Sequence, residues 1–227
     1  GVAWSSPAYI GNTSSNIINM FMTNNYLMIG KTDGLFYYDS DGGVHPIMPE
    51  LETYRSTDNF KYQVGWQTGS YFSLGTGLAE ITSFNSFDTV GPLSKIDDLN
   101  KVGSVIGLTS EKEWVYVIMD EGTNNILYKG REITREGETR WIWCPWVFLG
   151  TNACTTALVV QHTATDRRLW FGYGANTAYV ILSDNPLADS AARFAPAGWI
   201  RMSYESGTNI AFDKMFQQPI VTETAAC

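Results

Sequence analysis

The sequence predicts an all-β fold built from consecutive four-stranded units, and three observations lead to this prediction. Aromatic residues make up 14% of the 227 residues, and the chain contains 21 glycines. Aromatic side chains are favoured in strands, whereas glycine is favoured in tight turns. A strand–turn–strand pattern recurs along the chain at a nearly constant spacing. No long helix is evident, since the best candidate is the short segment 187–194, LADSAARF.

The recurring pattern is a pair of apolar strands joined by a turn. We place the four turns near Gly30, Gly75, Asp120 and Gly172, which are separated by 45, 45 and 52 residues. This spacing is typical of the blades of a propeller, with a small insertion in the last unit. The hairpins are predicted at residues 26–38, 71–81, 114–128 and 169–182.

Flanking segments complete each unit. Strand-like segments precede the hairpins at residues 17–23, 62–67, 104–109 and 155–161. More irregular segments follow the hairpins at residues 44–48, 88–93, 141–149 and 198–203. Proline cannot donate a hydrogen bond to a neighbouring strand. Pro46, Pro92 and Pro145 each lie in a segment that follows a hairpin, and they indicate that these segments are the outer edge strands of their units.

The sequence therefore predicts a β-propeller segment of about four blades, each with four antiparallel strands. The predicted blades cover residues 15–55, 56–100, 101–150 and 151–205. Residues 206–227 are predicted to start a further blade, because segment 215–224 resembles a first strand. We expect these blades to belong to a larger propeller. A closed ring of four blades is the alternative.

Charge and cysteine content exclude several classes of protein. The net charge of −8 argues against a nucleic-acid partner, since phosphate binding depends on lysine and arginine. No run of about 18 apolar residues is present, so no membrane span is expected. Cys144, Cys154 and Cys227 match no zinc pattern. Cys144 and Cys154 could form a disulfide, although free thiols are the simpler interpretation.

No catalytic motif is found. The only histidines, His45 and His162, fall in different units, and the HExxH, GxSxG and GxxxxGK[ST] motifs are missing. The acidic pairs Asp97–Asp98 and Asp120–Glu121 are expected in turns. The sequence thus predicts no catalytic residue, no metal ligand set and no cofactor.

Segment 39–43, DSDGG, could be read as the start of a calcium loop. However, Val44 stands at the sixth position, where such a loop needs glycine. A tight hairpin turn is the simpler interpretation. Segment 56–60 begins like the repeated aspartate turn of sialidases, but Phe60 stands where that turn has glycine.

Three tryptophans are the candidate binding residues: Trp141, Trp143 and Trp146. Side chains alternate along a strand, so Trp141 and Trp143 should share one face, with Ile142 and Cys144 on the other. Two adjacent indoles could stack on a sugar or anchor a partner chain. Packing between neighbouring blades is the favoured alternative.

Several segments resemble large virion proteins of tailed bacteriophages. They are residues 128–132 (YKGRE), 141–146 (WIWCPW), 168–182, 184–190 and 193–195. The resemblance extends over residues 15–224 as a pattern of strands and turns, and it supplies no functional residues. It implies a propeller within a tail, baseplate or receptor-binding polypeptide of a virion.

The leading functional hypothesis is a non-enzymatic structural component of a bacteriophage tail that contributes to virion assembly and host-receptor attachment. The expected partners are other tail or virion proteins, a host surface glycan or protein, and further copies of the chain. The expected location is the virion tail, or the cell exterior if the protein is not viral. The alternatives are a glycosidase-like carbohydrate-active enzyme and a secreted lectin or adhesin on a propeller scaffold.

Overall fold

The computed structural model describes residues 9–23, 25–53, 55–83, 86–92, 103–163, 166–185 and 189. Contacts divide the chain into units 1–193 and 194–227, and every described residue lies in the first unit. The described residues form fifteen strands and one short 3₁₀ helix, η1 (Pro49–Thr53), without an α-helix. None of the described helical structure is long and apolar enough to cross a membrane. The predicted all-β class is confirmed.

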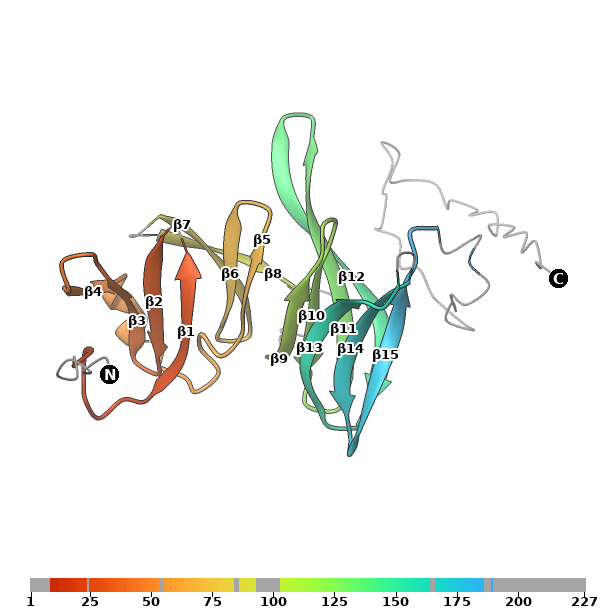
Figure 1. The fold of residues 1–227 in the computed structure, drawn as a ribbon, viewed down its shortest axis with the longest axis horizontal. Coiled ribbons are helices and arrows are strands. Elements are labelled where there is room, and N and C mark those ends of the chain that lie inside the picture. Colours follow the sequence, from red (N-terminus) through yellow and green to blue (C-terminus); the bar gives the residue numbers. More distant parts are fainter. Residues whose placement is uncertain are drawn as a thin grey trace, which may run out of the picture. The chain divides into compact units, whose positions relative to one another are not determined.

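The strands form four antiparallel sheets, each a meander of strands consecutive in sequence (Figure 1). The first sheet contains β1 (Ile17–Thr23), β2 (Tyr26–Lys31), β3 (Gly34–Tyr38) and β4 (Val44–Ile47). The second contains β5 (Gln63–Trp66), β6 (Gly69–Leu74), β7 (Gly77–Ser83) and β8 (Ser86–Gly91). The third contains β9 (Ser104–Ser110), β10 (Val115–Asp120), β11 (Asn125–Arg135) and β12 (Glu138–Gly150). The fourth contains β13 (Cys154–Gln161), β14 (Arg167–Tyr173) and β15 (Asn176–Leu182).

The observed strands lie where the sequence predicts them, with one clear difference. β11 continues to Arg135 and β12 begins at Glu138, so their hairpin is much longer than expected. Pro46 lies in β4 and Pro145 in β12, and both strands are sheet edges, as their prolines indicate. Pro92 directly follows the edge strand β8. The predicted segments 198–203 and 215–224 lie outside the described residues, as does segment 187–194 apart from Asp189.

The turns lie near the predicted positions, but not every predicted residue is itself in the turn. Gly30 and Gly172 lie inside β2 and β14, and each turn begins two residues further along the chain. Asp120 is the last residue of β10. A Cβ atom at Gly30 would meet the side chain of Phe60, and one at Gly172 would meet Thr155. These glycines therefore permit close packing against another segment rather than a turn. Gly75, with a φ of +57°, does lie in its predicted turn.

We expect Gly30→Ala to lower the free energy of unfolding by about 1–3 kcal/mol, because the added methyl group overpacks the site against Phe60. Gly65→Ala in β5 is the matched control, since nothing lies within 4 Å of its Cβ position. The control should change the free energy of unfolding by less than about 0.5 kcal/mol. Guanidinium-induced unfolding measures both values, and equal effects would contradict the close contact at Gly30.

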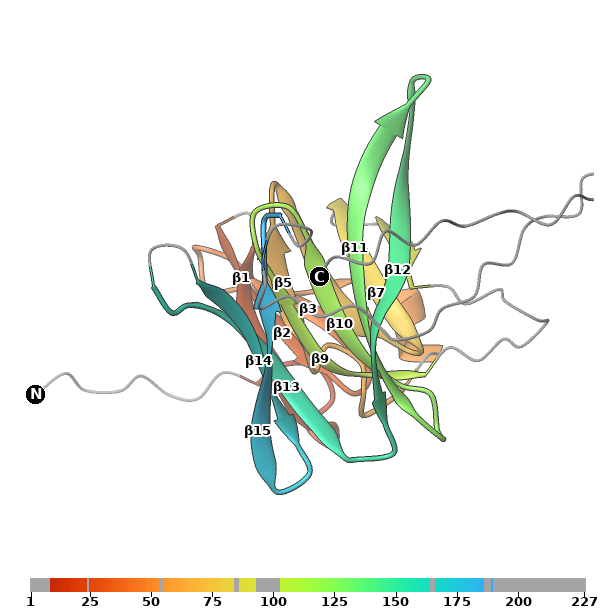
Figure 2. The ribbon, with the colours of Figure 1, turned by 90° about the vertical axis from the view of Figure 1, so that its right-hand side faces the viewer.

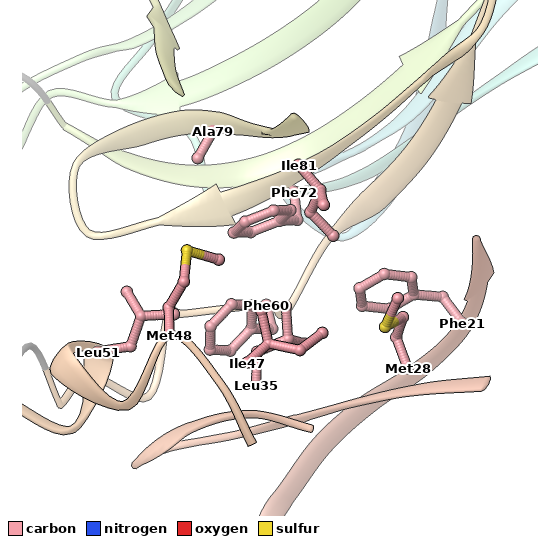
Figure 3. Packing of buried hydrophobic residues seen from close by; sticks show 10 residues of the cluster. All are labelled: Phe21, Met28, Leu35, Ile47, Met48, Leu51, Phe60, Phe72, Ala79 and Ile81. Carbon is pink, nitrogen blue, oxygen red and sulfur yellow. The ribbon is translucent and has the colours of Figure 1, made fainter. Parts of the chain in front are cut away.

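Three hydrophobic cores lie between consecutive sheets. The first joins the first and second sheets through ten buried residues: Phe21, Met28, Leu35, Ile47, Met48, Leu51, Phe60, Phe72, Ala79 and Ile81 (Figure 3). The second joins the second and third sheets: Trp66, Tyr71, Leu78, Val90, Val105, Leu108, Val115, Val117, Met119 and Tyr128. The third joins the third and fourth sheets: Tyr116, Ile118, Leu127, Leu149, Cys154, Ala157, Leu169, Phe171 and Leu182.

The alternation of side chains in β10 explains how one sheet serves two cores. Residues 115–119 are all buried. Val115 and Val117 belong to the core shared with the second sheet, whereas Tyr116 and Ile118 belong to the core shared with the fourth. Because successive side chains point to opposite faces, both faces of the third sheet are covered. The four sheets thus pack face to face in sequence order.

Both described cysteines are free, which confirms the simpler interpretation of Cys144 and Cys154. Cys144 is exposed on β12, while Cys154 is buried in the third core, where burial raises the pKa of its thiol. We expect a maleimide reagent at neutral pH to modify Cys144 at least about tenfold faster than Cys154. Peptide mass spectrometry of the modified protein measures both rates, and equal rates would contradict the burial of Cys154.

Candidate functional site

Trp141 and Trp143 lie on one face of β12, as predicted. Their rings are stacked with centroids 5.2 Å apart and an interplanar angle of 14°. The side chains of Ile142 and Cys144, at the intervening positions, are exposed. The alternation predicted for this segment is therefore present.

The face that carries these two indoles packs against the second sheet. The ring of Trp141 lies 5.2 Å from both Trp66 and Tyr71, measured between centroids. Trp143 Nε1 donates a hydrogen bond to the carbonyl oxygen of Val90 at 2.6 Å. Gly130 lies opposite Trp143 in β11, and a Cβ atom there would meet the indole. The geometry thus favours packing between sheets over an open stacking platform.

Glu80 lies beside this indole cluster and was not singled out from the sequence. The hydroxyl of Tyr71 donates a hydrogen bond to Glu80 Oε1 at 3.1 Å. Burial raises the pKa of the Glu80 carboxyl group, the hydrogen bond from Tyr71 opposes this, and the charges of Glu132 and Asp88 raise it further. A raised carboxyl pKa is one mark of an acid–base group. The cross-strand pairing of β6 with β7, which brings Tyr71 opposite Glu80, was the signal available in the sequence.

Trp146 is not part of the same cluster, so the three candidate residues do not form one site. Its ring lies 5.7 Å from that of Tyr116, on the side of the third sheet that faces the fourth sheet. The reason is the alternation of side chains, which places an even-numbered residue opposite the odd-numbered Trp141 and Trp143.

Trp146 instead belongs to a group that we call the cationic–aromatic cluster: Trp114, Trp146, Lys129 and Arg131. Lys129 Nζ lies 4.9 Å from the ring centroid of Trp114 and 5.0 Å from that of Trp146. The guanidinium carbon of Arg131 lies 4.7 Å from the Trp114 centroid. Lys129 and Arg131 were not singled out from the sequence, although their i, i+2 spacing on one strand puts both on the same face.

A hydrogen-bonded network lies next to this cluster. The Tyr116 hydroxyl donates to Glu111 Oε1 at 2.5 Å, and Arg167 donates to Glu111 Oε2 at 2.9 Å. Arg167 also donates to Asp184. Burial is the main cause that raises the pKa of Tyr116, and the hydrogen bond to Glu111 adds to it. The network links the third and fourth sheets through Glu111 and Arg167.

The segment considered as a calcium loop forms the turn between β3 and β4. The carboxylate of Asp39 accepts hydrogen bonds from the backbone of Asp41 at 3.0 Å and of Gly43 at 2.6 Å. Its other oxygen lies 2.7 Å from His45 Nε2. The hydrogen bond with His45, followed by that from Gly43, lowers the pKa of Asp39. The carboxylate is therefore engaged in forming the turn.

The remaining candidates also have structural positions. Asp120 accepts a hydrogen bond from the backbone of Gly122 at 2.8 Å, and Glu121 accepts one from Tyr128. The backbone N–H of His162 donates to the Asp166 carbonyl at 2.8 Å in the turn before β14. Phe60 is fully buried in the first core. Asp97 and Asp98 lie outside the described residues. Within the described parts of the chain, no three histidine, cysteine or acidic residues are grouped as a metal site.

Comparison with known proteins identifies no relative. No family model and no curated protein matches the chain. Two similar solved structures are extracellular domains of Bacteroides proteins (B. thetaiotaomicron), one assigned to a hybrid two-component system and the other to a one-component system. The first is 13% identical with a TM-score of 0.46 and the second 12% identical with a TM-score of 0.49. They match 77% and 80% of this chain, which spans only 23% and 24% of their lengths.

Proposed function

We propose that the chain is a β-propeller segment that acts as a non-enzymatic structural and attachment module of a bacteriophage tail. The observation that carries the scaffold part of this proposal is the packing of four meander sheets in sequence order. Each of the three cores joins one sheet only to the next one along the chain. Repeat architectures in which each unit contacts only its neighbours have this arrangement.

Contacts between the first strands of the sheets give further support to a propeller. β5 packs against β9, and β9 packs against β13. The last strands, β4, β8 and β12, are sheet edges. In a propeller the blades surround a central channel, so first strands would lie innermost and fourth strands outermost.

The attachment role is supported by the chemistry of the described residues. Asp39, Asp120 and Glu121 form turns or turn-associated hydrogen bonds, and Glu111 is shared between Tyr116 and Arg167. These four carboxylates are thus engaged in structural hydrogen bonds. An attachment role, unlike acid–base catalysis, does not require a free carboxylate. The viral setting, with other tail proteins and further copies as partners and the virion tail as location, rests on the resemblance of segments 128–132, 141–146, 168–182, 184–190 and 193–195.

A glycosidase-like enzyme remains the second candidate, and Glu80 is the observation that favours it. Its pKa is raised, and it lies next to the tyrosine that contacts Trp141. General acid catalysis in glycosidases requires such a carboxyl group together with a second one.

One experiment separates the two functions. The purified protein is applied to a glycan array and to host cells, and the glycans that bind are then assayed for hydrolysis. We expect binding without turnover, and unchanged binding by the Glu80→Gln variant. Hydrolysis that is lost in Glu80→Gln would replace the attachment proposal with the enzymatic one. Failure to bind any glycan or cell surface would contradict the attachment role itself.

A further inference from the structure

We propose that the cationic–aromatic cluster binds an oligosaccharide that contains uronic acid, through the carboxylate and the apolar face of one sugar ring. The proposal deepens the attachment role and rests on it for its biological meaning. The binding chemistry itself rests on Trp114, Trp146, Lys129 and Arg131. Of these four residues, only Trp146 was a candidate binding residue from the sequence, and the comparisons assign a role to none of them.

The two cations are held in place by the indoles. Lys129 Nζ lies within 5.0 Å of the ring centroids of both Trp114 and Trp146, and Arg131 lies beside Trp114. Cation–π contacts of this kind attract a cation to the ring face. Side chains that are already ordered lose less entropy when a ligand binds. The cluster is therefore organised before an anion arrives.

Neither cation is paired with a carboxylate. In the part of the chain that the structure describes, the ion pairs of Arg167 and Arg168 are with acidic residues, whereas neither Lys129 nor Arg131 forms an ion pair. Glu111 is close in sequence to Trp114, but its two oxygens are taken by Tyr116 and Arg167. Lys129 and Arg131 are two residues apart on β11, so their side chains lie on the same face of the strand. They form a local positive site that an anionic group would neutralise.

The surroundings favour a sugar over a simple anion. Both indoles are half-buried, so each leaves part of its surface accessible. Cys144 pairs with Lys129 and Ile142 with Arg131 across the β11–β12 register, and both of these neighbours are exposed. The indole surface that the two cations leave uncovered can contact the apolar face of a pyranose, whereas inorganic phosphate or sulfate would use only the charges. A planar carboxylate matches the fork of a guanidinium group.

The cluster lies where the long hairpin leaves its sheet. The pairing of β10 with β11 ends at Val115 and Gly130, so Arg131 is the first residue of β11 beyond β10. Figure 2 shows the β11–β12 hairpin continuing well beyond β9 and β10. Arg131 is exposed, and Lys129 is half-buried beside it. This position leaves the cationic face open to an extended polymer such as a surface polysaccharide.

The test uses tetragalacturonic acid as the probe, with its fully methyl-esterified form as the neutral control. Isothermal titration calorimetry of the protein should give tighter binding of the acid than of the ester. Loss of one charge-assisted contact should weaken binding of the acid about tenfold in Arg131→Gln. The double variant Lys129→Gln/Arg131→Gln should not bind measurably. Arg135→Gln, on the same face but nearer the hairpin tip, is the matched control and should bind within about twofold of the unmodified protein.

Several outcomes would overturn the inference. These are equal affinity for the acid and the ester, no effect of the double variant, no binding of the acid at millimolar concentration, or displacement of the acid by an equal concentration of inorganic sulfate. Adsorption to host cells is measured with the same variants. Adsorption without binding of tetragalacturonic acid overturns the ligand assignment alone. Binding of the acid without adsorption to cells overturns the attachment role and leaves the ligand assignment supported.

Discussion

Phe72→Ala is expected to lower the free energy of unfolding by about 3–5 kcal/mol, the range for removing a buried aromatic side chain. Phe72 is fully buried in the core between the first and second sheets, with its ring centroid 5.2 Å from that of Phe60 (Figure 3). Removal of the ring takes away contacts with both sheets and leaves a cavity between them. The loss of stability should be large because the first and second sheets pack together through this core.

The matched control is Phe148→Ala in β12, where the phenyl ring is 66% exposed. Its free energy of unfolding should change by less than about 0.5 kcal/mol. Guanidinium-induced unfolding, followed by tryptophan fluorescence, measures both variants. A loss below about 1 kcal/mol for Phe72→Ala would contradict the packing of the first sheet on the second.

Trp143→Ala is expected to cost about 2–3 kcal/mol, less than a fully buried tryptophan because the indole is half-buried. The substitution removes the stacking on Trp141 and the hydrogen bond to the carbonyl oxygen of Val90. Both contacts help to hold the third sheet against the second. The free energy of unfolding should therefore fall, while binding at the cationic–aromatic cluster on the other face should persist in the folded variant.

Trp143→Phe tests which contact matters more. It keeps an aromatic ring next to Trp141 but lacks the N–H donor, so the loss should be about 1 kcal/mol from the hydrogen bond alone. Unfolding and glycan binding are measured for both variants. Unchanged stability together with lost glycan binding would show that Trp143 is a stacking platform and not a packing residue.

The strands could be predicted from the sequence because the information is local. The sequence of β10 begins with five successive apolar residues, among them β-branched and aromatic ones, which is typical of a strand covered on both faces. All five are buried in the structure. Pro46 and Pro145 identified edge strands for an equally local reason, since proline cannot donate to a neighbouring strand.

Other features depend on contacts between segments far apart in sequence. Gly30 was taken as a turn residue because only its contact with Phe60 shows that it is a packing glycine. The cationic–aromatic cluster brings together Trp114, Lys129 and Trp146 from three segments, and their meeting depends on the register of β10, β11 and β12. Such a register is set by the whole sheet rather than by any one motif.

The central claim is that the four sheets are successive blades of a propeller. An electron cryo-microscopy map of the protein at side-chain resolution tests it most directly. We expect sheets arranged around a common axis, with β1, β5, β9 and β13 nearest to that axis and β4, β8 and β12 furthest from it. Sheets packed in pairs as sandwiches, or stacked without a common axis, would contradict the claim.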